Sequence, residues 1–307
     1  GQGGYTIDRV YYVENDEANK KILDAYRKHV KKMFMLVGYP EAKAQAKMEN
    51  VIALETRMAK AGKPNVELRD PGANYNKMSF ADFVKQYDGF DWKAYFDNQG
   101  MTDIDYLSVG QPKALAEAMQ VLKDEPVQVL KDWMQWGIIN GAASILGDEM
   151  YAEYFDFEYR VMTGAQQPKP RWKRSVNAVN GVLGEAVGQL YVEKYFPAAN
   201  KERMEKLVRN LQKALGERSD AQDWMSDSTK AAAHEKLDAF YVKIGYPDKW
   251  RDYSSMTIDP SKSLYENRKE IAKWALADMV ERKWKKPVDN TEWFMNPQTV
   301  NAYYNPT

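Results

Sequence analysis

Apolar residues recur at three- and four-residue intervals along most of the chain, and this period predicts a mainly α-helical protein. One helix is expected from Asp16, a favourable N-cap residue, to about Val37, where the following Gly38 and Pro40 indicate its end. Its apolar face consists of Ile22, Leu23, Tyr26, Val30, Met33 and Phe34. Further helices are expected at 41–61, 79–87, 91–97, 112–123 and 126–146.

The helical pattern continues through the second half of the chain. One long helix is expected over 171–196, although it contains Gly181, Gly184 and Gly188. Each glycine costs about 1 kcal/mol of helix propensity relative to alanine, so their presence indicates that another helix packs closely here. Three more helices follow: one with the apolar stripe Met204, Leu207, Val208, Leu211 and Leu215, one that begins at Ser226 and carries Ala233, Leu237, Phe240 and Ile244, and one over 264–284.

The last residues depart from the helical pattern. Thr299–Tyr304 is rich in side chains that favour β-structure, and Asn305-Pro306 cannot continue a strand. We therefore expect a short terminal β-strand. A single strand leaves its N–H and C=O groups unpaired, so it needs a partner strand that the rest of this sequence does not offer.

Composition narrows the class of protein. The 307 residues suit two domains or one large domain. Basic and acidic residues number 44 each, and no Lys or Arg block stands out, which argues against nucleic-acid binding. The absence of cysteine excludes thiol catalysis, cysteine-ligated zinc and disulfides. No apolar run is long enough to span a membrane, and the Gly1-Gln2-Gly3-Gly4 start is interpreted as an internal or processed end.

One short pattern resembles a metal site. His234-Glu235 opens like the zinc motif H-E-x-x-H, but Asp238 stands where the second histidine is needed. That motif places two imidazoles on one helix face, and a third ligand completes the site. The only other histidine, His29, lies in another expected helix, so a His/Asp contact is favoured over a metal site. A Ser-His-Asp triad on either histidine stays open.

A second candidate is Glu185, which lies in a glycine-rich apolar stretch. A buried carboxylate is a candidate functional group, because burial perturbs its pKa. The favoured interpretation is an ion pair with Arg171, Lys173 or Arg174.

The terminal run offers different chemistry. An extended segment can bind a peptide by strand addition, in which main-chain hydrogen bonds supply affinity independent of sequence. The Asn301 side chain carries both a donor and an acceptor, so it can hold a peptide unit. The alternative is a plain edge strand.

The residues Asn301-Ala302-Tyr303-Tyr304 resemble the Asn-Ala-(Tyr/Phe)-Tyr motif of the neprilysin-like zinc endopeptidases, the family of neprilysin, endothelin-converting enzyme and bacterial oligopeptidase O. Further likenesses extend over most of the chain. They are Asp8–Tyr12, in which Val10 departs from the family pattern, Arg171-Trp172, Val179–Gly181, Ala186–Glu193, Trp224-Met225, Thr229-Lys230, Glu235-Lys236, Ile244–Asp248 and Asn290–Trp293.

The resemblance implies a fold in which a multi-helix domain caps a thermolysin-like catalytic domain around a cavity where oligopeptides are cleaved. Residues 1–255 are then expected to form the cavity-capping helical domain. Residues 256–307 would return to the catalytic domain and end in the substrate-binding edge strand. There Asn301, through its side chain, and Ala302, through its backbone, would hold the substrate main chain, with Tyr303 beside them.

The family's zinc ligands and catalytic glutamate lie beyond the matched motifs, so the resemblance assigns no catalytic or metal-binding residue to this chain. It implies the N-terminal portion of a zinc metalloendopeptidase, inactive alone, whose zinc is bound by residues outside this chain. A second chain would carry the catalytic half. Peptides are the implied substrates, and the implied location is extracytoplasmic. The competing interpretation is a non-catalytic helical binding or scaffold module.

Overall fold

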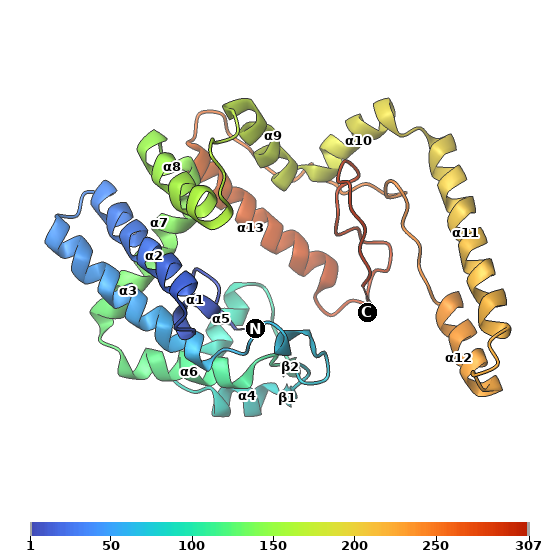
Figure 1. Ribbon diagram of the computed structural model, residues 1–307, viewed down its shortest axis with the longest axis horizontal. Helices are drawn as coiled ribbons and strands as arrows, with labels where there is room; N and C mark the ends of the chain where they lie inside the picture. Colours follow the sequence, from blue (N-terminus) through green and yellow to red (C-terminus); the bar gives the residue numbers. More distant parts are fainter. Residues whose placement is uncertain (1, 306–307) are drawn as a thin grey trace. The chain divides into compact units, whose positions relative to one another are not determined.

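The computed structural model describes residues 2–305, most of which are helical (Figure 1). The chain divides into two compact units. The larger unit comprises 1–168 and 258–284, and the smaller unit comprises 169–257 and 285–307. The expected division into residues 1–255 and 256–307 is a division by function and stays a prediction, as does the assignment of 256–307 to a catalytic domain.

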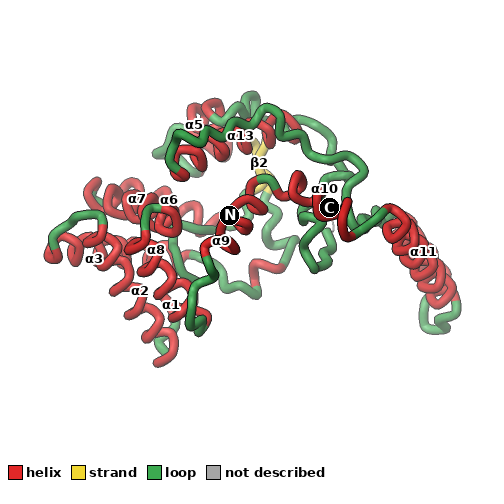
Figure 2. Tube along the Cα trace, turned by 90° about the horizontal axis from the view of Figure 1, so that it is seen from above, coloured by secondary structure: helices red, strands yellow, loops and turns green. Residues whose placement is uncertain are grey.

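Helices, drawn in red in Figure 2, form most of the larger unit. Its only described strands are a short antiparallel pair, labelled β1 and β2 in Figure 1. Its helices are α1 (Val10–Val13), α2 (Glu17–Leu36), α3 (Glu41–Ala61), α4 (Phe80–Gln86), α5 (Trp92–Asn98), α6 (Pro112–Asp124), α7 (Val127–Ala142), α8 (Asp148–Phe155) and α13 (Leu264–Lys283). The strands are β1 (Lys77–Ser79) and β2 (Tyr106–Ser108). Short 3-10 turns occur at Glu67–Arg69 and Ala143–Ile145, and a π-helix, η3, covers Asp156–Val161.

The main core lies where α2 packs against α3, α7 and α8, and α2 and α3 are neighbours in Figure 1. The expected start of α2 is confirmed, since Asp16 accepts hydrogen bonds from the backbone N–H groups of Ala18 and Asn19, both at 3.0 Å. The expected apolar face is confirmed as well. Its buried members are Tyr26, Val30, Met33 and Phe34, which pack against Val51, Ile52, Trp136 and Phe157.

Two polar clusters are buried within this helical unit. Glu55 of α3 accepts hydrogen bonds from the hydroxyl groups of Thr6, Tyr12 and Tyr26, and only 1% of its surface is exposed. Lys47 of α3 lies against Asp132 of α7, with Lys47 Nζ 2.5 Å from Asp132 Oδ1. Both clusters connect α3 to elements far away in the sequence.

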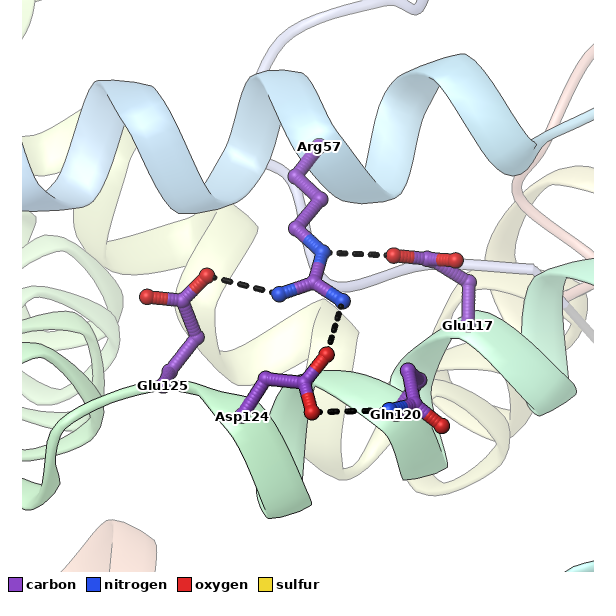
Figure 3. A network of polar contacts seen from close by, with 5 residues as sticks. All are labelled: Arg57, Glu117, Gln120, Asp124 and Glu125. Carbon is purple, nitrogen blue, oxygen red and sulfur yellow. Dashed lines mark hydrogen bonds and ion pairs between the residues drawn. The ribbon is translucent and has the colours of Figure 1, made fainter.

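A third polar cluster lies nearer the surface and ties α3 to the end of α6 (Figure 3). The Arg57 guanidinium donates from Nε to Glu117 at 2.5 Å, from Nη1 to Glu125 at 2.8 Å and from Nη2 to Asp124 at 3.0 Å. Gln120 donates to the other oxygen of Asp124 at 2.7 Å. Hydrogen bonds to Glu125 and Glu117 raise the pKa of Arg57 above its ordinary value, so the cation is held in one orientation.

The smaller unit contains α9 (Arg171–Val182), α10 (Gly184–Tyr195), α11 (Ala198–Asp220) and α12 (Asp227–Asp238). The N-cap predicted at Ser226 is confirmed, because its Oγ accepts a hydrogen bond from Thr229 N. The helix itself ends at Asp238, so the prediction that it continues through Phe240 to Ile244 is wrong. The apolar stripe of α11 forms a helix as expected, but Met204, Leu207, Leu211 and Leu215 are exposed in the described chain.

The single helix expected over 171–196 is also wrong, because the chain breaks at Leu183, where φ is −114° and ψ is 36°. Gly181 and Gly184 flank the break, and glycine lowers the cost of leaving the helical conformation. The close approach expected at the glycines does occur. The segment that approaches is a loop, Asn296–Gln298, and not a second helix.

The expected terminal strand does not form among residues 2–305. Residues 299–304 carry no regular secondary structure, and Val300 is fully exposed. Val and Tyr favour β-strands, but they form one only when a neighbouring strand makes the backbone hydrogen bonds of a β-ladder with them. The described ladder, β1–β2, does not include this segment. Pro306, expected to end the strand, lies outside the described residues.

Candidate functional site

The three residues that the resemblance implies as substrate contacts lie together on the surface of the smaller unit. Asn301, Ala302 and Tyr303 are all exposed. Their backbone makes short local bonds: Asn301 N donates to Thr299 O at 3.1 Å, and Ala302 N donates to the Asn301 side-chain oxygen at 2.8 Å. Both bonds link residues no more than two positions apart in the chain.

Aromatic side chains hold this segment against neighbouring loops of the smaller unit. The Tyr303 ring lies edge-on to Phe294, with centroids 6.1 Å apart, and its hydroxyl accepts a bond from Phe294 N at 3.5 Å. The Tyr304 ring lies 5.9 Å from that of Phe240. Lys243 Nζ donates to Glu292 O at 2.6 Å and so joins the same two loops. The segment is therefore supported on one side while Asn301 and Ala302 face solvent.

The segment before it, Asn296–Gln298, lies against the break between α9 and α10. Gln298 Nε2 donates to Asn180 Oδ1 at 3.1 Å and to Gly184 O at 3.0 Å. Asn296 Nδ2 donates to Asn180 O at 3.3 Å. In the sequence, Asn180 stands out only as part of a family likeness, and Gln298 does not stand out at all. The glycines gave the available signal, since they indicated a close approach at this position.

Glu185 is half-buried, as its apolar surroundings suggested, but its contact differs from the expected one. Glu185 Oε2 accepts a hydrogen bond from the backbone N–H of Arg251 at 2.8 Å. Its own N–H donates to the Tyr253 hydroxyl at 3.4 Å. The carboxylate thus fixes the 251–253 loop beside α10, and the expected ion pair with Arg171, Lys173 or Arg174 stays a prediction.

Both histidines pair with a carboxylate. His234 Nε2 lies 2.7 Å from Asp220 Oδ1, so the His/Asp contact is made across the α11–α12 hairpin and not with Asp238. His29 is buried in the larger unit, with Nδ1 2.9 Å from Glu153 Oε1 and its ring stacked on Phe157. Burial raises the pKa of the nearby Glu158, an effect partly offset by His29.

The described residues do not provide a metal site. Throughout residues 2–305, no three His, Asp, Glu or Cys side chains are grouped so that they could hold an ion. The partial motif at His234 therefore lacks the further ligands that zinc requires. Nor is any helix in the described part of the chain long and apolar enough to cross a membrane.

Comparison with known proteins identifies the family. Residues 1–247 match the N-terminal model of peptidase family M13. The neutral endopeptidase of Lactobacillus helveticus is 30% identical over 288 residues, which cover 94% of this chain and 44% of that protein. Neprilysin-3 of Drosophila melanogaster is 28% identical over 325 residues, covering 100% of this chain and 41% of that protein. The chain thus spans less than half the length of these relatives.

Solved structures agree. The zinc metalloprotease Zmp1 of Mycobacterium tuberculosis, in complex with an inhibitor, superimposes with a TM-score of 0.90 at 39% identity and covers 99% of this chain and 46% of that one. PepO of Lactobacillus rhamnosis superimposes with a TM-score of 0.89 at 22% identity over 97% of this chain and 47% of that one, which shows the shared fold alone. The neprilysin-like resemblance and the mainly helical fold are confirmed, and the chain belongs to peptidase family M13.

Proposed function

We propose that this chain is the N-terminal, mainly helical portion of a zinc-dependent metalloendopeptidase that hydrolyses oligopeptides in an enclosed cavity. The main support is the match to the family model over residues 1–247, together with the structural similarity to Zmp1 over 99% of the chain. Residues 1–255 supply the cap, and 256–307 return to the catalytic domain. An extracytoplasmic location is part of the proposal, and fractionation of the source cells checks it.

Zinc and the catalytic residues belong, in this proposal, to a part of the protein outside these 307 residues. The family match supports that assignment, because the matched relatives are more than twice as long as this chain. The chain alone is then inactive, and a second chain or a continuation of this one supplies the catalytic half.

The isolated chain should bind no stoichiometric zinc and cleave no peptide, whereas assembly with the remaining half should restore both. Elemental analysis and cleavage of a fluorogenic oligopeptide measure the two properties on the same samples. The matched control is the remaining half without this chain. Stoichiometric zinc in the isolated chain would contradict the proposal, and an assembled protein with zinc but no peptidase activity would favour the non-catalytic helical module.

Asn301, Ala302 and Tyr303 are proposed to contact the substrate backbone. Their exposure, and the local character of the bonds made by Asn301 and Ala302, support this role. Asn301 offers a peptide unit one donor and one acceptor, and Ala302 has a side chain too small to block the approach of a main chain. Tyr303 supports the segment through its contact with Phe294.

Asn301→Ala in the assembled enzyme should raise KM for peptides about tenfold with little change in kcat. Two hydrogen bonds of roughly 0.5–1.5 kcal/mol each are lost equally from the bound substrate and the transition state. Steady-state kinetics with a fluorogenic peptide measure the effect. The control is Asn290→Ala, since Asn290 is another exposed asparagine of the smaller unit. Equal KM values for the two variants would exclude Asn301 as a substrate contact.

A further inference from the structure

Two buried glycines on one face of α10, Gly184 and Gly188, make room for the loop Asn296–Gln298. This loop precedes residues Asn301–Tyr303, the proposed substrate contacts, which we call the substrate-contact segment. A Cβ added at Gly188 would lie 2.8 Å from Pro297 Cδ, which is closer than real Cβ contacts come, and 3.0 Å from Pro297 Cγ. A Cβ at Gly184 would overlap the side-chain amide of Asn296. Gly181, one turn earlier on α9, is exposed and has nothing within 4 Å of the same position. The close fit is thus specific to Gly184 and Gly188.

Hydrogen bonds complete this fit. The helix break at Leu183 leaves carbonyl groups in the last turn of α9 without partners within the helix, and Asn180 O is one of them. Asn296 Nδ2 donates to that carbonyl, and Gln298 Nε2 bridges Asn180 Oδ1 and Gly184 O. The loop therefore satisfies polar groups that the broken helix exposes, while Pro297 fills the space over Gly188.

The same loop leads directly into the substrate-contact segment. Thr299 N donates to Asn296 O at 2.9 Å, so the chain turns at Pro297 and Gln298. Asn301 follows only three residues later. The contacts of Asn296–Gln298 thus fix the N-terminal side of the exposed residues 299–302 relative to α10, while the contact of Tyr303 with Phe294 holds their C-terminal side.

We propose that Asn180, Gly184 and Gly188 form a latch that grips Asn296–Gln298 and so positions Asn301 and Ala302 for peptide binding. This inference rests on the proposed function of those two residues. The latch acts by preorganisation: a segment already held in place loses less conformational freedom when substrate binds. The three latch residues are positioning residues, because they touch the loop and not the substrate.

The first test measures the latch without any catalysis. Because the chain has no cysteine, Leu190→Cys on α10 and Val300→Cys can be spin-labelled specifically, and both side chains are exposed. Double electron–electron resonance spectroscopy of the labelled parent protein should give a narrow distribution of distances between the two labels. Gly188→Ala should broaden it, because the rigid Pro297 ring must move away, whereas Gly181→Ala should leave it unchanged. Equal widths in the two variants would overturn the latch.

The second test measures its consequence in the assembled enzyme. Gly188→Ala should raise KM for peptides about tenfold with kcat nearly unchanged, and combining it with Asn301→Ala should add little, because both changes disable one contact. Broadened distances with unchanged KM would refute the positioning role. If Asn301→Ala itself left KM unchanged, the proposed substrate contact would be wrong. The spin-label distances would still test the latch, because they do not depend on substrate.

A third variant covers the case in which Gly188→Ala impairs folding. Asn180→Ala adds no bulk to the latch and favours the helix, yet it removes the side-chain acceptor of Gln298. It should broaden the same distance distribution and raise KM in the same direction. A narrow distribution with wild-type KM in this variant would overturn the proposal.

Discussion

Replacing Asp132 by alanine should lower the free energy of unfolding by about 3–5 kcal/mol, because it leaves the Lys47 ammonium buried without its counter-ion. The two side chains are 5% and 3% exposed, and Lys47 Nζ lies 2.5 Å from Asp132 Oδ1. Asn50 and Gln128 also donate to this carboxylate, both at 2.8 Å. Urea unfolding of the 307-residue chain measures the change.

The matched control removes both charges. Lys47→Met combined with Asp132→Leu fills the site with apolar side chains, and it should recover most of the stability that Asp132→Ala loses, because no buried charge is left unpaired. Breaking a buried ion pair costs about 3–5 kcal/mol. If the free energy of unfolding of Asp132→Ala lay within about 1 kcal/mol of the parent value, the pair would therefore be open to water.

The pH dependence of the pair has a definite sign. Burial disfavours the Asp132 carboxylate, but hydrogen bonds from Lys47, Asn50 and Gln128 outweigh it and lower the pKa below its ordinary value. A lowered folded-state pKa gives stability that is present above the unfolded-state pKa and is lost as pH falls through the folded-state pKa. The penalty of Asp132→Ala should therefore shrink in acid.

Glu55→Ala should cost about 3–5 kcal/mol of stability, since it strips the shared acceptor from three hydroxyl groups and leaves a cavity. Thr6 and Tyr26 donate to Glu55 at 2.8 Å each, and Tyr12 donates at 2.7 Å. Trp136 Nε1 donates in turn to Thr6 and Tyr26, at 3.0 and 2.8 Å. Urea unfolding again measures the loss.

Glu55 should respond to pH in the opposite direction from Asp132. Burial raises its pKa, although hydrogen bonds from Tyr12, Thr6 and Tyr26 partly offset the effect. A raised folded-state pKa gives stability that is fully present below the unfolded-state pKa and is lost as pH rises through the folded-state pKa. Glu55→Gln has nearly the same shape and cannot titrate. The free energy of unfolding of Glu55→Gln relative to the parent should rise as pH rises from the unfolded-state pKa of Glu55 to its folded-state pKa. A difference that stays constant with pH would contradict the raised pKa of Glu55.

These clusters mark a limit of sequence reasoning. Glu55, Lys47 and Asp132 look like ordinary polar positions on helices, because nothing local shows that each faces the core. Glu55 bonds to Tyr26, which lies 29 residues away in the chain, and Lys47 and Asp132 lie 85 residues apart. The proposed substrate contacts at Asn301, Ala302 and Tyr303 rest on family resemblance, and for the proposed latch at Gly188 the sequence indicates only a close approach.

The sequence by itself determined the local structure of this protein: the helical period, the caps at Asp16 and Ser226, and the motifs that identify the family. These features depend on residues within a few positions of one another, so the chain carries them without a fold. The tertiary structure alone decided that Glu55 is buried, that a loop and not a helix lies on Gly188, and that 299–304 forms no strand in the described chain. Each of those outcomes depends on a partner distant in sequence, and only packing selects that partner.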